Sequence, residues 1–139
     1  MPYRANYPRT VREVLNRNRK YHPAAMVAVR ALRQSKAWRG SDGERVLKFR
    51  VCLRALAQAY GVACPRLVYS PGMADHYSRA TNTIVLGTLS VVTLLHEFGH
   101  ARGFDERQTC GWSINLFRRV FPRSFERCRQ VRHTLKKRR

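Results

Sequence analysis

Hydrophobic positions recur every three or four residues over much of the first half of the chain. Between Ser41 and Gly61 this spacing predicts an amphipathic helix. Ser41 and Glu44 match a capping box at its start, and Gly61 suits its end. An alanine-rich run that opens with proline predicts another helix over residues 23–38. The basic stretch before it, residues 9–20, is expected to form a short helix or an arm.

The pattern changes in the middle of the chain. Three short segments, residues 66–70, 74–79 and 83–86, are prone to form strands and are separated by turn residues. They predict a small antiparallel or mixed three-stranded sheet. Residues 89–102 then return to helical spacing with strongly apolar positions, and Gly103 follows. This segment is predicted to be a core helix packed on the sheet.

Two more helices are predicted after Gly103. Asp105 and Gln108 match a second capping box, which opens a helix that Pro122 stops. Beyond it, residues 123–139 keep apolar residues at helical spacing and are strongly basic. We predict a basic amphipathic C-terminal helix with a frayed tail.

These elements predict a single α+β domain, because 139 residues suit one core and no linker or repeat divides them. No apolar run reaches the roughly 18 residues that a membrane helix needs. The first residues contain no apolar segment of signal-peptide length, so we expect an intracellular protein. The expected parts are a helical part (1–63), a core of sheet and metal site (64–121), and a basic helix and tail (122–139).

Charge is the unusual feature of the composition. Lys and Arg number 28 against 8 Asp and Glu, a formal net charge of +20, and most of the basic residues are arginine. Such a field attracts polyanions, and the planar guanidinium suits phosphate. Nucleic acid is the leading expected partner and an acidic protein the second; the alternative is an arginine-rich surface that only keeps the protein in solution. The expected polyanion-binding residues are Arg118, Arg119, Arg123, Arg127, Lys136, Lys137, Arg138 and Arg139.

The cysteines do not suggest a zinc site of their own. Cys52, Cys64, Cys110 and Cys128 include no Cys-x-x-Cys pair. In a reducing compartment they are expected to stay free. Most are predicted to be small buried residues.

The stretch His96-Glu97-Phe98-Gly99-His100 carries the candidate chemistry. Residues four apart share one face of a helix, so His96 and His100 can direct two imidazole nitrogens at one ion. Glu97, about 100 degrees around the helix, can reach a water on that ion without binding the ion. This division of roles predicts a metallopeptidase site with one Zn²⁺ and with Glu97 as the general base.

Such a site needs a third protein ligand. Asp105 and Glu106 are the nearest acidic residues, but Asp105 is the expected helix cap. Glu106 can fold back over the two histidines because Gly103 permits a sharp turn. We therefore predict Glu106 as the third ligand. His133, in the basic tail, is expected to lie too far away.

The stretches TLLHEFGHARG and DERQTCGWSINLF resemble the zincin metallopeptidases, in particular the small gluzincin-like domains of the ImmA/IrrE type. The resemblance covers about residues 65–121. It implies a mixed sheet packed on the motif helix, with His96, His100 and Glu106 as zinc ligands and Glu97 as general base. The metzincins fit less well, because a glutamate replaces their usual third histidine and all methionines precede the motif. SprT-like proteases, which act on proteins crosslinked to DNA, are a weaker resemblance still.

Other residues near the motif are weaker candidates. Tyr77 and His76, on the middle predicted strand, can steady an oxyanion, although isolated strand residues are more often packing or surface groups. Cys110, one turn beyond the third ligand, is either a core residue or a fourth, inhibitory ligand. Arg102 and Arg107 flank the ligands and either bind an acidic substrate group or are accidental neighbours.

Two functions follow as hypotheses. The first is a zinc-dependent endopeptidase that its basic surface directs to nucleic acid, nucleoprotein or an acidic protein. Its peptide substrate would pair with an edge strand over residues 74–79. The second is a nucleic-acid-binding module in which zinc only ties helices together. A structural zinc site has four protein ligands, whereas a catalytic site leaves one position to water. The sequence suggests three good ligands, which favours catalysis.

Overall fold

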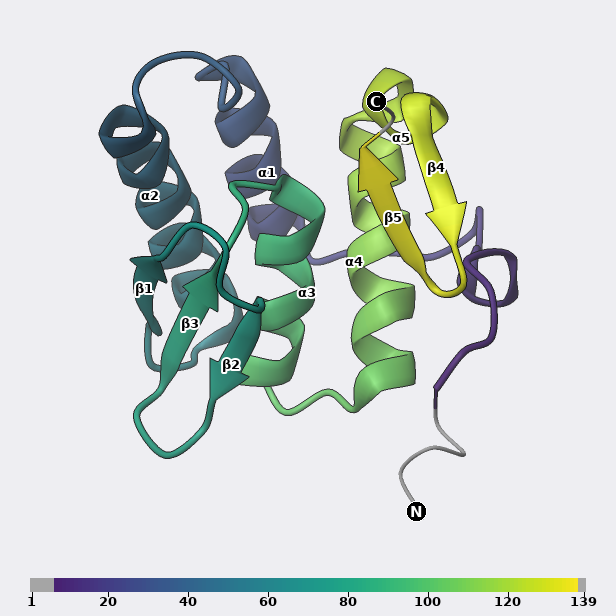
Figure 1. The fold of residues 1–139 in the computed structure, drawn as a ribbon. Coiled ribbons are helices and arrows are strands. Elements are labelled where there is room, and N and C mark those ends of the chain that lie inside the picture. Colours follow the sequence, from purple (N-terminus) through teal and green to yellow (C-terminus); the bar gives the residue numbers. More distant parts are fainter. Residues whose placement is uncertain (1–6, 138–139) are drawn as a thin grey trace.

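A computed structural model describes residues 7–137 of the chain, with the side chain of Lys137 left out. The helix that carries the histidine motif, α3, lies in the middle of the fold (Figure 1). Two helices and a three-stranded sheet lie on one side of it, and the remaining helices and a hairpin lie on the other. This arrangement confirms the predicted α+β class. The helices are α1 (Pro23–Gln34), α2 (Asp42–Tyr60), α3 (Val91–Ala101), α4 (Glu106–Val120) and α5 (Pro122–Arg127).

Local capping signals fix where the longer helices begin. The Ser41 side chain accepts from the Glu44 amide and Glu44 reaches back, so α2 opens with the predicted capping box. Asp105 and Gln108 form the same arrangement at the start of α4. Capping of this kind contributes about 1 kcal/mol per helix. Helix α2 ends as predicted at Gly61, which adopts the left-handed conformation with φ of 64°.

The sheet is mixed, one of the two predicted forms. Its strand order is β1-β3-β2, with β1 (Arg66–Tyr69) parallel and β2 (His76–Ser78) antiparallel to β3 (Thr83–Leu86). Strand β2 is therefore an edge strand, as expected for residues 74–79. The sheet packs against α3, which places the edge strand next to the motif helix.

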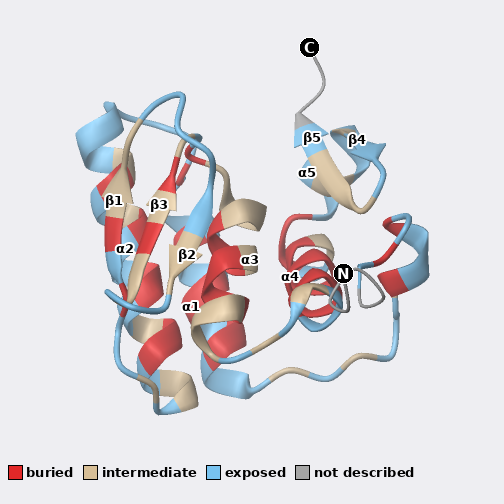
Figure 2. Ribbon diagram, turned by 60° about the horizontal axis from the view of Figure 1, so that its bottom comes forward, coloured by how far each residue is buried: buried red, intermediate tan, exposed pale blue. Residues whose placement is uncertain are grey.

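Buried residues gather on the faces that the helices turn toward one another (Figure 2). The main core lies among α1, α2, α3, α4 and the sheet, and includes the fully buried Phe49, Phe98 and Ile84. Burying a side chain of this size contributes about 1.5–3 kcal/mol. No helix between residues 7 and 137 is both long enough and apolar enough to cross a bilayer.

The N-terminal segment is an arm with one short helical turn, η2 (Arg12–Val14), and thus combines the two predicted possibilities. Buried Asn115 of α4 holds it: its Nδ2 donates to the Val14 carbonyl at 2.6 Å, and its Oδ1 accepts from the Asn16 amide at 2.7 Å. A second, smaller core, here called the arm cluster, lies between the arm and α4. Its buried members are Val11, Val14, Cys110 and Ile114.

The C-terminal helix predicted for residues 123–139 is wrong. Helix α5 ends at Arg127, and the chain continues as an antiparallel hairpin of β4 (Cys128–Val131) and β5 (Thr134–Lys137). Arg132 and His133 form the two-residue turn, with Arg132 at φ of 55°.

Apolar spacing misled the prediction because the same residues also suit two strands. Phe125, Cys128 and Leu135 pack against the core, but Val131, which a helix would have buried with them, is 39% exposed. Val131 and Thr134 beside the turn are β-branched, which favours an extended backbone.

Close contact between α3 and α4 generates a prediction for Gly99. A Cβ added there would overlap Thr109 Oγ1 and lie 2.7 Å from Thr109 Cβ. Gly99→Ala should therefore lower the free energy of unfolding by about 1–3 kcal/mol, the usual cost of overpacking. Urea denaturation of the metal-free protein measures the change.

Gly43→Ala is the matched control, because its Cβ would meet only Ser41 Oγ at 3.9 Å. Its free energy of unfolding should be unchanged or higher by up to about 1 kcal/mol. If both variants were equally stable, the described packing of α3 on α4 would be incorrect.

Candidate metal centre

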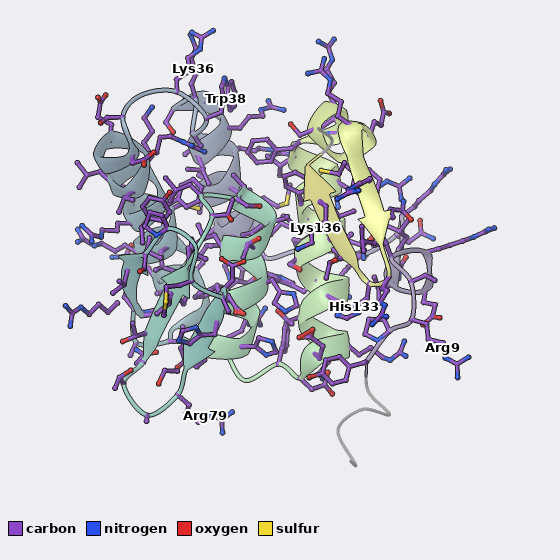
Figure 3. The ribbon with its side chains drawn as sticks, viewed as in Figure 1. Arg9, Lys36, Trp38, Arg79, His133 and Lys136 are labelled. Atoms are coloured by element: carbon purple, nitrogen blue, oxygen red, sulfur yellow. The ribbon has the colours of Figure 1, made fainter. Side chains whose placement is uncertain are left out.

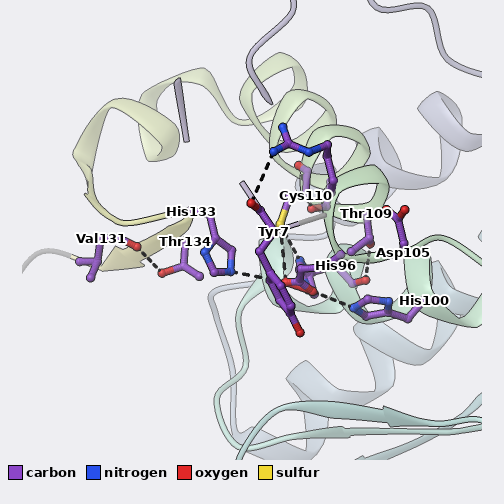
Figure 4. Close-up of polar contacts among 12 residues, drawn as sticks. Tyr7, His96, His100, Asp105, Thr109, Cys110, Val131, His133 and Thr134 are labelled. Carbon is purple, nitrogen blue, oxygen red and sulfur yellow. Dashed lines mark hydrogen bonds and ion pairs between the residues drawn. The ribbon is translucent and has the colours of Figure 1, made fainter. Parts of the chain in front are cut away.

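Two helices bring the predicted ligands together. His96 and His100 lie one turn apart on α3, and Gly103, at φ of 96°, lets the chain turn sharply into α4. Glu106 in the first turn of α4 then folds back over the histidines. Its Oε1 lies 2.9 Å from His96 Nε2 and 3.0 Å from His100 Nε2 (Figure 4). The structure thus brings all three predicted ligands to one place.

The orientation of His100 directs its Nε2 at the Glu106 carboxylate. Its Nδ1 lies 2.9 Å from the Phe104 carbonyl oxygen, which can only accept, so Nδ1 carries a hydrogen. In the neutral ring, Nε2 then points a lone pair at the Glu106 carboxylate. Two acceptors at 3.0 Å repel each other unless a proton or a metal ion lies between them. A carbonyl that fixes the ring in this way is also the usual support of a metal-binding histidine.

The distances suit a small cation. Ligand atoms about 2.0–2.1 Å from a tetrahedral zinc are about 3.3–3.4 Å apart. The observed 2.9 and 3.0 Å differ from this by only a few tenths of an ångström. Within the described residues, donor atoms of two triads also lie within 4.8 Å of one another: His96, Glu106 and Cys110, and His96, Glu97 and His100. The protein therefore has His, Glu and Cys groups that can hold a metal ion.

Ionisation of the two glutamates differs. Burial acts to raise the pKa of Glu106, but hydrogen bonds from His100 and His96 outweigh it and hold that pKa well below its usual range. Burial raises the pKa of Glu97, against the opposing influence of the histidines. Glu97 is 5% exposed, and its Oε2 has no hydrogen-bond partner among residues 7–137. One carboxylate is thus paired and the other is buried with an oxygen free to accept.

His133 was wrongly predicted to be remote. The hairpin turn brings its Nε2 to 3.4 Å from Glu106 Oε2 (Figure 4). The error follows from the C-terminal helix, which would have carried this residue away from the site. The sequence signal that was missed is the pair of β-branched residues around Arg132 and His133.

Cys110 is buried, which is one of its two predicted descriptions, and it lies close to the predicted ligands. It is buried in the arm cluster, yet its Sγ lies 3.8 Å from His96 Nδ1 and from Glu106 Oε2. Burial, and then the charge of Glu106, raise the pKa of its thiol. In this state it is a neutral neighbour of the ligands. Asp105 caps α4 as predicted.

The accessory candidates line a hollow beside the motif. Tyr77 and His76 border it together with Glu97 and His100. The Tyr77 hydroxyl, however, donates to Asn82 Oδ1 at 2.7 Å and so already has a partner. Asp75, which the sequence gave no reason to select, borders this hollow and a second one that Glu97 shares with His96 and His133.

Both flanking arginines have partners within the protein. The Arg102 guanidinium lies over the Tyr60 ring, 3.7 Å from its centre, and over the Phe104 ring at 4.3 Å. Arg107 lies 3.7 Å from a Glu13 carboxylate oxygen. These contacts favour structural roles for the two residues.

The expected polyanion-binding residues are spread over several elements. Arg118 is partly buried and lies over Phe125, and Arg119 donates to the Arg19 carbonyl at 3.0 Å. The expected polyanion-binding residues described on α5 and the hairpin are exposed. Lys136 lies on β5, on the side of the site that the hairpin covers (Figure 3). The exposed residues of this group are Arg119, Arg123, Arg127 and Lys136. The Lys137 side chain, Arg138 and Arg139 lie outside the described residues.

Metal binding by the α3–α4 site generates a second prediction. Zinc at 100 times its Kd should add about 2.7 kcal/mol to the free energy of unfolding. His96→Ala should abolish this increase, because one of the two imidazoles is lost. His76→Ala removes an exposed histidine beside the site and should keep the increase. Thermal unfolding with and without zinc measures it; equal loss in both variants would contradict the assignment.

Comparisons with known proteins do not place the chain in a family. No protein-family model, no curated protein and no solved structure matched it. The function is therefore inferred from the residues and distances described above.

Proposed function

We propose that the protein is a zinc-dependent metallopeptidase of the zincin type, with His96, His100 and Glu106 as ligands. The observation that carries the proposal is the convergence of three donor groups beside a buried carboxylate. The two Nε2 atoms lie 2.9 and 3.0 Å from one oxygen of Glu106, and Glu97 next to them has a free buried oxygen. A purely structural site would leave Glu97 without a role.

Each residue has a distinct part in the proposed reaction. When bound, zinc would polarise the scissile carbonyl and make a water more acidic. Glu97 takes the proton of the attacking water and passes it to the nitrogen of the departing amine. Burial raises the pKa of Glu97 and so makes it a stronger base. His100, held through Nδ1 by the Phe104 carbonyl, keeps Nε2 directed at the ion.

The substrate we propose is an extended peptide. Strand β2 is an edge strand next to α3, and its residues border the hollow that contains Glu97. A peptide that pairs with β2 would be held by main-chain hydrogen bonds, with little demand on its side chains. The scissile bond would then lie beside the ligands.

A second function is favoured by the additional donors near the site. His133 lies 3.4 Å from one Glu106 oxygen and Cys110 Sγ lies 3.8 Å from the same oxygen. If either of them joined His96, His100 and Glu106, the zinc site would have four protein ligands and would be closed and structural, and the protein would be a basic nucleic-acid-binding module. The free oxygen of Glu97 favours the peptidase over this alternative.

Replacing Glu97 by glutamine tests the proposal. Gln keeps the shape of Glu but cannot take a proton, so Glu97→Gln should lower kcat about 10²- to 10⁴-fold. Both proteins should hold one zinc, measured by elemental analysis. Peptide cleavage is followed with an unfolded protein substrate and mass spectrometry.

Asp75→Asn is the control for charge, because Asp75 borders the same hollows and its charge is only the smallest of the influences on the pKa of Glu97. It should keep most of the activity. If the parent held zinc but did not cut any peptide, with or without nucleic acid, the structural function would replace the proposed one.

We also propose that the basic surface binds a polyanion, with nucleic acid favoured over an acidic protein. The support is the net charge of +20 and the exposed Arg123 and Arg127, which lie one turn apart on α5. Replacing both by glutamine should reduce the slope of log K against log salt for duplex DNA by about 1.8. Fluorescence anisotropy at several salt concentrations measures the slope.

Arg54 and Arg66 form the control pair, because they are exposed on α2 and β1, on the other side of α3. Their double glutamine variant loses the same charge and should keep the parent slope. Equal slopes in all three proteins would contradict a binding surface on α5.

A further inference from the structure

We propose that His133 is a positioning residue for Glu106, which makes the β4–β5 hairpin a part of the metal centre. The inference rests on the proposed function, because it concerns the third ligand of the same site. It assigns a role to a residue that lies 27 positions beyond that ligand in the sequence and belongs to another element.

The two oxygens of Glu106 face different partners. Oε1 lies between His96 and His100, at 2.9 and 3.0 Å from their Nε2 atoms. Oε2 points the other way, to His133 Nε2 at 3.4 Å and Cys110 Sγ at 3.8 Å. A carboxylate can turn about its last bond, so a partner on Oε2 decides whether Oε1 stays directed at the ion. His133 Nε2, at 3.4 Å, can be that partner when this nitrogen carries a hydrogen.

The distances favour a supporting role over direct binding of the ion by His133. Among the described residues, two triads of donor groups have atoms within 4.8 Å of one another, and His133 belongs to neither: His96, Glu106 and Cys110, and His96, Glu97 and His100. His133 contacts the oxygen that faces away from the two imidazoles. His133 therefore lies on the side of Glu106 that faces away from His96 and His100.

Three contacts hold the hairpin turn in this place. The Val11 amide donates to the Arg132 carbonyl at 3.0 Å, which ties the turn to the N-terminal arm. Leu135 packs against the arm cluster. The Tyr7 ring lies beside that of His133, tilted by 57° and with 5.9 Å between ring centres. Because the turn is fixed by both a main-chain bond and apolar packing, the position of His133 is built into the fold.

Coverage by the hairpin also limits the access of water to the ligand. The Glu106 side chain is 16% exposed and that of His133 is 23% exposed. His133 and Thr134 form one wall of the hollow that contains His96 and Glu97. A carboxylate that is shielded from water and held by a further histidine binds a cation in a defined orientation.

Zinc affinity tests the inference without any assay of catalysis. His133→Ala should weaken zinc binding about 10- to 100-fold, the usual effect of losing a partner of a ligand. His133→Gln should retain most of the affinity, because its amide can donate to Oε2. Competition with a chromophoric zinc chelator measures the Kd. Gln130→Ala, an exposed position on β4 of the same hairpin, should leave the Kd unchanged.

X-ray absorption of the bound zinc counts its imidazole ligands. We expect two in the parent and two in His133→Ala, because His133 does not bind the ion. Three in the parent and two in the variant would overturn the inference and make His133 a direct ligand. A Kd for His133→Ala equal to that of the parent would also overturn it.

His96→Ala separates the inference from the function on which it rests. If the parent binds zinc and His96→Ala does not, an unchanged His133→Ala contradicts only the role of His133. A parent that takes up no zinc contradicts both. Circular dichroism and the unfolding midpoint of the metal-free proteins show whether His133→Ala keeps its fold. If it does not, the zinc Kd of His133→Gln, which retains a hydrogen-bond donor, tests the role of His133 instead.

Discussion

The close approach of α3 and α4 is the contact on which the rest of the site depends. Gly99 leaves no side chain between the helices, and Thr109 fills that space and donates from Oγ1 to the His96 carbonyl at 2.6 Å. The same approach brings Glu106 within hydrogen-bond distance of both histidines. Ligands from two helices converge on one ion only if the helices stay this close. The glycine within the histidine motif thus helps to bring the proposed ligands together.

A second constraint is the charge distribution. The chain carries a net charge of +20, yet two of its few acidic residues are withdrawn from water in one place. Glu106 stays ionised because two imidazoles bond to it, whereas burial raises the pKa of Glu97. The protein therefore has two largely buried glutamates inside a basic surface, and the two regions suit ligands of opposite charge. In the proposed function the interior would hold the metal ion, and the basic surface would bind a polyanion.

Signals that act over a few residues predicted much of the fold and of the site. The two capping boxes, the helix with His96 and His100, and the return of Glu106 were all predicted from spacings of three to ten residues. The hairpin was not, because apolar spacing over four positions fits either a helix or two strands. Its turn also has Arg132 at positive φ, without the Gly or Asn that usually indicates such a turn. Because the hairpin was not predicted, the position of His133 near Glu106 was not predicted either. Asp75 comes close to the site only because the sheet packs against α3, and no local pattern in the sequence indicates this.

Together, the hairpin and the sheet determine from which side a peptide can reach Glu97. Glu97 borders two hollows. One is lined by His133 and Thr134 of the hairpin, which is tied to the arm and packed on the arm cluster. The other is bordered by β2, whose outer edge has no strand partner within residues 7–137. A strand edge offers free main-chain donors and acceptors, whereas the hairpin turn offers side chains already engaged with Glu106 and Tyr7. In the proposed peptidase the substrate therefore enters along β2, and the hairpin closes the opposite side of the metal centre.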